Sequence, residues 1–389
     1  MPDAMGHPPC IVAGRLPYNA KSMRVTMLSK ALVVGAYQRK CELIASHRDI
    51  ELTVLVPPSW KTGKHIDALE RLHTRGYNLR VIPLRFSGNF HLHYYPTLAH
   101  ELACAQPDIV HIDEEPYNLA TYLALRSARS LLARTVIFSW QNLLRRYPPP
   151  FRWMERYVLT HVDTAIAGNA AARSVLQAKG YKGTVSVIPQ FGVDTEQFRP
   201  ADNPRKSTAF TVGYTGRLVP EKGIDVLLRA LAGLPVSTQA IIVGAGREAE
   251  KLQALANELH LNNRVRFLPP VSSAQMPGIY AKMDALVLPS RTLPNWKEQF
   301  GRVLIEAMSS GVPVIGSRSG EIPVVIGDAG LVFNENDTAS LRRHIERLAS
   351  QPALCADLAT RGRTRAIAHY SMEQIAAETV AVYRSLLSA

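Results

Sequence analysis

The sequence has few cysteines and no long apolar run, and both absences narrow the classes of protein it can encode. Its 389 residues include only four widely separated cysteines, with no Cys-x-x-Cys and no His/Cys spacing typical of zinc sites. No stretch approaches the length of apolar residues that a membrane-spanning helix needs. Residues 1–22 lack the continuous apolar segment of a signal peptide. We therefore expect a reduced, cytoplasmic protein without a metal site.

What is present is an ordinary globular composition with an excess of positive charge. Hydrophobic residues make up 47% of the chain and charged residues 20%, which excludes a disordered or fibrous protein. The length predicts two domains. Residues 1–200 hold 24 Lys and Arg against 15 Asp and Glu, whereas the remainder holds 21 against 17. The basic first half predicts an anionic partner, such as a phosphorylated substrate, an acidic lipid or a nucleic acid.

Short apolar runs alternate with helical segments in two series, and this alternation is typical of parallel sheets. The expected strands are 24–28, 51–56, 79–83, 108–112, 135–139, 164–167, 185–189, 210–214, 240–244, 265–268, 285–288 and 312–315. We expect two doubly wound α/β domains, 23–198 and 209–370, which bind ligands beyond the carboxyl ends of their strands. A disordered extension (1–22), a Pro-rich linker (199–208) and a final helix (371–389) complete the prediction.

Two glutamates flank the start of a predicted helix in the second domain. This helix is expected to begin near Gly301 and to end before Gly311. Glu298 would then lie just ahead of the helix, where the N-terminal N–H groups and the dipole also attract a phosphate. Glu306 would lie among apolar neighbours, where a carboxylate needs donors such as vicinal sugar hydroxyls. A helix cap and a structural acid remain the alternative interpretation.

Glycines follow two predicted strands of the second domain. Gly216 would let the backbone approach a diphosphate, and Arg217 and Lys222 would neutralise its charge without a metal. The alternative is two solvated charges on a loop. Gly244 belongs to a weaker glycine pattern that is consistent with a plain tight turn, or with a wall for a nucleotide base.

The first domain offers two further candidates at strand ends. Gly35 precedes a helix and predicts a phosphate or sugar site, while the neighbouring Arg39 and Lys40 are expected to be surface charges. Asp113 and the two glutamates after it end another strand. One of these acids would bind an acceptor or take a proton, and at least two are expected to be solvated loop acids.

Four arginines and several aromatic residues are interleaved between residues 143 and 157. Arg145, Arg146, Arg152 and Trp153 belong to this segment, whose composition is typical of docking on an anionic bilayer. Stacking on single-stranded nucleic acid is the alternative interpretation. No recognisable nucleic-acid module accompanies the segment, so a nucleic-acid partner is not expected.

Three segments together resemble the retaining, two-domain glycosyltransferases of family 4. They are Gly216-Arg-Leu-Val-Pro-Glu-Lys-Gly223, Pro289-Ser-Arg291 and Glu298-x-Phe-Gly-x4-Glu306-Ala-Met-Ser-Ser-Gly-x-Pro-Val. The resemblance implies two facing Rossmann-like domains of the GT-B architecture, with the final helix crossing back to the first domain. It also implies hexose transfer, with retention, from a UDP- or GDP-linked sugar to a glycan or lipid-linked acceptor in polysaccharide or glycolipid biosynthesis. Such an enzyme would work in the cytoplasm, at the periphery of a membrane.

The resemblance assigns roles to individual residues. The nucleotide and its diphosphate would be held by Gly35, Gly216, Arg217, Lys222, Gly244 and Glu306, with Glu306 on the ribose. The donor sugar would contact Glu298, Phe300 and Gly301. Catalysis would rest on Glu298, Arg217 and Lys222. No metal or other cofactor is implied, because two cations would supply the charge and no Asp-x-Asp occurs.

The chain departs from the family pattern after the strand at 135–139. Many members carry a His there, near the sugar's 6-position, whereas this chain carries Trp140-Gln141-Asn142. Gln141 can bond a sugar hydroxyl but cannot act as an acid or base. We place Asp113 and Gln141 on the acceptor side. A nucleotide-sugar epimerase of the same architecture and a non-catalytic protein that binds lipid or nucleic acid are the competing hypotheses.

Overall fold

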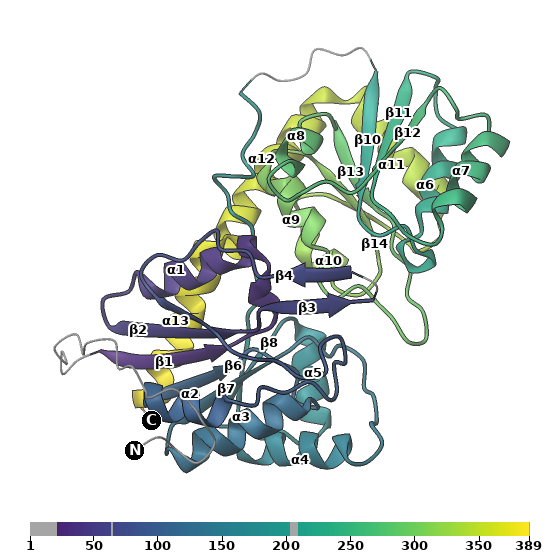
Figure 1. The fold of residues 1–389 in the computed structure, drawn as a ribbon. Helices are drawn as coiled ribbons and strands as arrows, with labels where there is room; N and C mark the ends of the chain where they lie inside the picture. Colours follow the sequence, from purple (N-terminus) through teal and green to yellow (C-terminus); the bar gives the residue numbers. More distant parts are fainter. Residues whose placement is uncertain (1–21, 64, 203–208, 389) are drawn as a thin grey trace. The chain divides into compact units, whose positions relative to one another are not determined.

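The computed structural model describes residues 22–63, 65–202 and 209–388 (Figure 1). The chain divides into two compact units, which we call unit 1 (residues 1–190 and 376–389) and unit 2 (residues 191–375). The expected N-terminal extension, 1–22, lies outside the described residues except for its last position. Most of the expected linker, 199–208, also lies outside them.

A seven-stranded sheet forms the centre of unit 1, and all its strands are parallel. The strands are β1 (Met23–Leu28), β2 (Ile50–Val56), β5 (Asn78–Val81), β6 (Ile109–Ile112), β7 (Arg134–Ser139), β8 (Thr164–Ala167) and β9 (Thr184–Val187). Their order is β5-β2-β1-β6-β7-β8-β9. The order reverses between β1 and β6, so the switch point where such folds bind ligands lies at the carboxyl ends of these two strands.

Helices connect these strands, and one short antiparallel hairpin was not predicted. The helices are η1 (Ala31–Val33), η2 (Gly35–Gln38), α1 (Arg39–Ala45), α2 (Leu98–Ala105), α3 (Leu119–Ser130), α4 (Phe151–His161) and α5 (Ala170–Ala178), and the hairpin is β3 (Ser59–Thr62) with β4 (His65–Ala68). Helix α3 packs against α2, α4, β6 and β7. Its buried alanines at positions 120, 124 and 128 share one face, and their small size permits this close packing.

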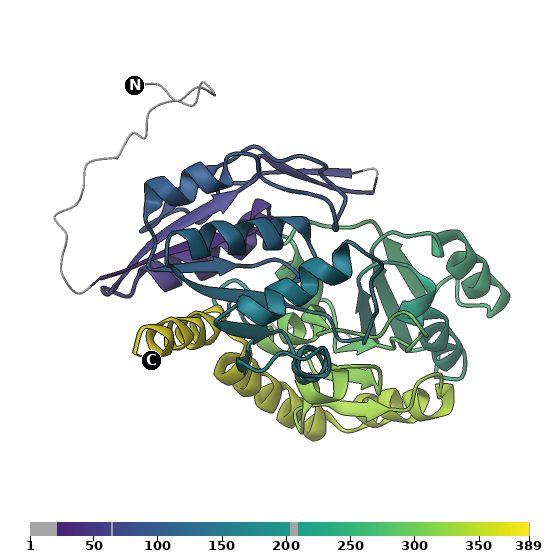
Figure 2. The ribbon, with the colours of Figure 1, turned by 90° about the horizontal axis from the view of Figure 1, so that it is seen from below.

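The final helix, α13 (Met372–Ser388), begins in unit 2 and packs on unit 1 (Figure 2). In unit 1 the buried Tyr383 hydroxyl lies 2.7 Å from Nδ1 of His111 on β6. Arg384 makes two hydrogen bonds of 2.8 Å to the carboxylate of Asp49. These contacts confirm the expectation that the last helix crosses back to the first domain.

Unit 2 holds a six-stranded parallel sheet in the order β12-β11-β10-β13-β14-β15. Its strands are β10 (Phe210–Thr215), β11 (Thr238–Val243), β12 (Val265–Leu268), β13 (Ala285–Leu288), β14 (Val314–Ser317) and β15 (Leu331–Phe333). Its helices are η3 (Pro220–Lys222), α6 (Ile224–Ala232), α7 (Ala249–Glu258), α8 (Met276–Tyr280), α9 (Arg302–Ser309), α10 (Ile322–Ile326), α11 (Thr338–Ser350) and α12 (Pro352–Tyr370). The prediction of two doubly wound α/β domains is confirmed. The switch point here lies between β10 and β13.

Candidate functional site

Two glycine turns meet at the carboxyl ends of β10 and β11. Gly216 (φ +143°) and Gly244 (φ +147°) both adopt backbone conformations that side chains disfavour. The Gly216 N–H donates to the carbonyl of Val243 at 3.0 Å. A Cβ on Gly244 would lie only 1.9 Å from the carbonyl oxygen of Gly216. The two turns therefore pack backbone against backbone, and a side chain at Gly244 would force them apart.

Lys222 and Glu298 meet at the switch point of unit 2. The ammonium of Lys222 lies 2.5 Å from Oε2 of Glu298, and both side chains are largely buried. Ser290, two residues after the end of β13, donates to the same Glu298 oxygen at 3.0 Å. The ring of Trp296 lies 5.1 Å from the Lys222 nitrogen, a cation–π contact. The structure thus brings two predicted residues together and adds Ser290 and Trp296, whose roles the sequence did not indicate.

Arg217 is placed differently from Lys222. Its side chain is 67% exposed, and its guanidinium lies 3.8 Å from the carboxylate of Glu221. An exposed ion pair of this kind contributes little free energy, so the guanidinium can reorient toward a ligand at low cost.

Glu306 lies in the second turn of α9 and is buried. Tyr280 donates to its Oε2 at 2.8 Å, and Arg302 donates to its Oε1 at 2.9 Å. Burial, together with the Glu306 carboxylate, raises the pKa of Tyr280 well above its usual value, so the phenol remains a donor. Each carboxylate oxygen can accept a second hydrogen bond. The arrangement is compatible with a ribose contact and also with the structural acid that we gave as the alternative.

The segment ahead of α9 follows the predicted boundaries. Gly301 caps the helix with φ +81°, and α9 ends at Ser309, before Gly311. Phe300 is buried, and its ring lies 5.6 Å from the ring of Tyr370 in an edge-to-face arrangement. This segment therefore lies at a helix N-terminus, where an anion is favoured.

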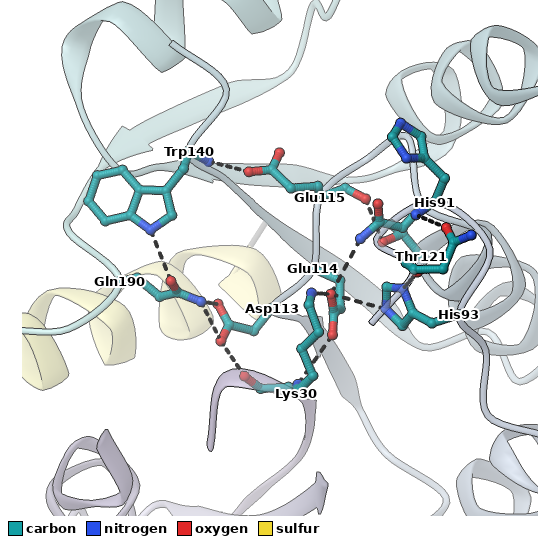
Figure 3. Close-up of polar contacts among 12 residues, drawn as sticks. Lys30, His91, His93, Asp113, Glu114, Glu115, Thr121, Trp140 and Gln190 are labelled. Atoms are coloured by element: carbon teal, nitrogen blue, oxygen red, sulfur yellow. Dashed lines mark hydrogen bonds and ion pairs between the residues drawn. The ribbon is translucent and has the colours of Figure 1, made fainter. Parts of the chain in front are cut away.

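Asp113 lies at the switch point of unit 1 (Figure 3). It accepts hydrogen bonds from Ser29 at 2.6 Å and from Gln190 at 2.9 and 3.0 Å. Burial raises the pKa of Asp113 to about 6, although the neighbouring Lys40 opposes that shift. This carboxylate can therefore exchange a proton near neutral pH.

Lys40 is buried, so the prediction that it is a surface charge is wrong. Only 4% of the residue is exposed, and its ammonium donates to the Gln190 carbonyl at 3.0 Å. Burial lowers its pKa, while the Asp113 charge opposes the shift. The first turn of α1 places this side chain against the end of the sheet, which the sequence pattern did not reveal. Arg39, by contrast, is partly exposed and pairs with Glu42.

Glu114 is also buried, with 2% of the residue exposed. It is paired with Lys30, which follows β1, and its Oε2 lies 3.4 Å from Nε2 of His93. Burial alone would raise the pKa of Glu114, but the positive charges of Lys30 and His93 outweigh burial and lower it to about 2.

Glu115 is half-buried and caps the end of β7. It accepts a hydrogen bond from the Ser139 hydroxyl at 2.8 Å. It also accepts one from the Trp140 backbone N–H at 2.8 Å (Figure 3). Burial raises the pKa of Glu115 to about 7 despite these bonds. The prediction that at least two of the three acids after β6 are solvated is therefore wrong. The parallel sheet places the ends of β1, β6 and β7 side by side, and their polar residues cover one another.

Gln141 stands next to this cluster. Its amide nitrogen donates to the Tyr147 hydroxyl at 2.7 Å, whereas its buried Oε1 has no hydrogen-bond partner within the described part of the chain. A buried carbonyl oxygen without a partner is costly, so a ligand hydroxyl that donated to it would be favoured.

Gly35 is covered by its own unit. Its N–H donates to the Glu70 carboxylate at 2.7 Å, and a Cβ at this position would lie 2.6 Å from the side chain of Leu72. The segment around residue 70 therefore covers Gly35, which we expect to contact the donor diphosphate.

Three of the four predicted membrane-facing residues line a cavity of about 880 Å³ in unit 1. Arg145, Arg146 and Arg152 line it, and Trp153 is exposed beside them on α4. Across residues 22–63, 65–202 and 209–388, no helix has the length and apolar character to cross a membrane. Within the same ranges, no three His, Cys, Asp or Glu side chains are grouped to hold a metal ion.

Comparison with known proteins places the chain in a family. Residues 42–197 match the family model described as Glycosyltransferase Family 4, and residues 195–365 match the model described as Glycosyl transferases group 1. Together the two models span most of the chain. The chain therefore belongs to the family 4, group 1 glycosyltransferases and has the GT-B fold.

Curated relatives agree with this assignment. D-inositol 3-phosphate glycosyltransferase of Streptomyces avermitilis is 31% identical over an alignment of 260 residues, with coverage of 60% of this chain and 54% of that protein. The Mycobacterium marinum protein of that name is 32% identical over 255 residues, covering 61% of this chain and 53% of that one. The chain thus spans about half the length of the curated relatives it matches.

Two solved structures show the same fold. Sucrose-phosphate synthase from Thermosynechococcus elongatus superposes with a TM-score of 0.70 at 20% identity, covering 94% of this chain and 99% of that one. HepE from Anabaena, solved in complex with UDP, superposes with a TM-score of 0.74 at 18% identity, covering 93% and 100%.

Proposed function

We propose that the protein transfers a hexose, with retention, from a nucleoside diphosphate sugar to a hydroxyl of a glycan or lipid-linked acceptor. In this reaction the bond from the sugar C1 to the diphosphate breaks and a bond from C1 to the acceptor oxygen forms on the same face. The acceptor proton passes to the departing diphosphate. No carboxylate nucleophile and no metal are required, because the protein supplies the positive charge.

The observation that carries this proposal is the Lys222–Glu298 pair beside the turns of Gly216 and Gly244. The ammonium of Lys222 lies 2.5 Å from the carboxylate of Glu298 at the strand ends where α/β sheets bind nucleotides. A diphosphate over the glycine turns would recruit Lys222 and the exposed Arg217. Glu298 would then bond the sugar hydroxyls, and Glu306 the ribose.

The donor and acceptor are proposed from the relatives as well as from the site. HepE was solved with UDP, which favours a UDP-linked donor here. The curated relatives are named for D-inositol 3-phosphate, so a phosphorylated polyol is an acceptor to be tested beside glycans and lipid-linked sugars. In unit 1, Asp113 and the unpartnered oxygen of Gln141 would position the acceptor or the donor sugar. We also propose a cytoplasmic location at a membrane surface.

The experiment is a transfer assay with UDP-, GDP- and ADP-sugars against these acceptor classes, with and without EDTA. We expect transfer that EDTA does not abolish and a product with the donor's anomeric configuration by NMR. Lys222→Met and Glu298→Gln should each lower transfer by about 100-fold or more, since each removes a charge from the reacting centre. Lys251→Met, which removes an exposed lysine, serves as the charge-matched control. A new sugar nucleotide formed without acceptor would instead establish an epimerase.

A further inference from the structure

A basic groove lies along one face of α4 in unit 1. Its volume is about 880 Å³, and three segments line it: residues 144–147, the α4 face and residues 178–183. The α4 residues that contribute are Arg152, Glu155, Arg156, Leu159 and Thr160. Their spacing of three and four residues places them on a single face of the helix. The groove is therefore built by one helix face and two loops of the same unit.

The lining is strongly positive. Six basic residues contribute to it, Arg145, Arg146, Arg152, Arg156, Lys179 and Lys182, against one acid, Glu155. Glu155 and Lys179 lie 2.5 Å apart and are both buried, so this pair is internally neutral. No carboxylate in the described ranges pairs with Arg146, Arg152, Arg156 or Lys182. Arginines that are not engaged by carboxylates suit a phosphate, which they bind through two parallel hydrogen bonds.

One large apolar side chain is exposed in the groove, and another is exposed next to a lining residue on α4. Leu144 lines the groove and is 62% exposed, and Trp153, adjacent to Arg152 on α4, is 63% exposed. A site for a small soluble phosphate gains nothing from such side chains. A tryptophan beside arginines is, by contrast, typical of surfaces that enter the interfacial region of a bilayer.

We propose that this groove binds the phosphate of an anionic lipid headgroup and docks unit 1 on a bilayer, with Trp153 and Leu144 entering the interface. The inference specifies, and rests on, the membrane association proposed above. The groove is separate from the proposed donor site. Every residue that lines the groove belongs to unit 1, whereas Lys222 and Glu298 belong to unit 2.

The groove also adjoins the proposed acceptor side within unit 1. The Lys179 nitrogen lies 4.9 Å from the centre of the Tyr147 ring, and the Tyr147 hydroxyl accepts the hydrogen bond from Gln141 at 2.7 Å. A single tyrosine therefore connects the groove wall with Gln141. A lipid-linked acceptor whose phosphate occupied the groove would be held on the same unit as Gln141.

The experiment compares co-sedimentation of the full chain with vesicles of phosphatidylcholine alone and of phosphatidylcholine with phosphatidylglycerol. We expect binding only to the anionic vesicles, weakening as salt is raised. The triple variant Arg146→Gln, Arg152→Gln, Arg156→Gln should bind roughly 100-fold more weakly, since each basic residue near an anionic bilayer contributes about a fivefold factor. The control variant Arg48→Gln, Lys61→Gln, Arg75→Gln removes the same charge from exposed sites outside the groove and should change binding less than about threefold.

Three outcomes would overturn the proposal. Equal loss of binding in both triple variants would show that net charge alone attracts the protein to vesicles. Wild-type binding by the groove variant would place the membrane contact elsewhere. Thermal stabilisation by glycerol 3-phosphate that the groove variant loses, without any vesicle binding, would assign the groove to a soluble phosphate. UDP binding, measured in parallel by calorimetry, distinguishes these failures from a failure of the proposed transfer reaction.

Discussion

Glu115 illustrates how burial sets the chemistry of a single side chain. Its folded pKa of about 7 lies above that of an exposed glutamate. The stability it contributes is therefore fully present below the unfolded pKa and is lost as pH rises toward 7. As pH rises from 4 to 8, the free energy of unfolding of Glu115→Gln should therefore increase relative to that of the wild type by roughly 2–3 kcal/mol. Urea unfolding across this range measures the difference.

Glu114→Gln provides the opposite case. The pKa of Glu114 is lowered to about 2, so its charge contributes stability above the unfolded pKa, which is lost as pH falls toward 2. This variant should be less stable than the wild type above about pH 5, with the gap closing in acid. If the stability difference from the wild type changed with pH in the same direction for both variants, the opposite pKa shifts of Glu114 and Glu115 would be contradicted.

The proposed ribose-binding role of Glu306 can be tested by comparing variants of Glu306 and of Tyr280, which donates a hydrogen bond to its carboxylate. If its carboxylate binds ribose, Glu306→Gln should weaken UDP binding by about tenfold or more, the effect of losing one hydrogen bond to a charged group. Tyr280→Phe removes the internal bond to the same oxygen and should change affinity less than about threefold. Calorimetric titration measures both variants. An equal loss of UDP affinity in both variants would show that Glu306 is a structural acid and not a ribose ligand.

The turn after β11 shows how one element constrains another. Gly244→Ala would force a Cβ to 1.9 Å from the Gly216 carbonyl oxygen at a positive φ, so at least one of the two turns must move. We expect a loss of about 2 kcal/mol or more in the free energy of unfolding and weaker nucleotide binding. Gly278→Ala, within α8 and with open space around it, should be neutral or stabilising by up to about 1 kcal/mol.

The boundaries of most elements follow from local patterns. The helix after Gly301 and the strands of both sheets lie where apolar periodicity and glycine placed them. The strand Leu331–Phe333 and the hairpin Ser59–Thr62 with His65–Ala68 were not predicted. A three-residue strand is too short to show a period, and each strand of the hairpin has only four residues, with Ile66 61% exposed rather than facing a core.

At the scale of the whole molecule, we propose a donor site in unit 2 and a lipid-binding groove in unit 1, and this separation is testable. UDP should slow hydrogen exchange in residues 213–223 and 298–306 of unit 2, because bound ligand stabilises the turns that contact it. Anionic vesicles should slow exchange in residues 144–156 and 178–183 of unit 1. Protection by UDP confined to unit 1 would contradict the assignment of the donor site. Vesicle protection of unit 2 alone would contradict the groove.

The sequence by itself determined the two α/β series, the glycine turns and the chemical character of the residues that we propose bind the donor, because strand periodicity and glycine conformation are local properties. Only the tertiary structure brought Lys222 and Glu298 into contact across 76 residues of sequence. It also buried Lys40 and Glu114 and formed the groove beside α4. Desolvation and ion pairing depend on which distant segments pack together, and a linear pattern does not specify that packing.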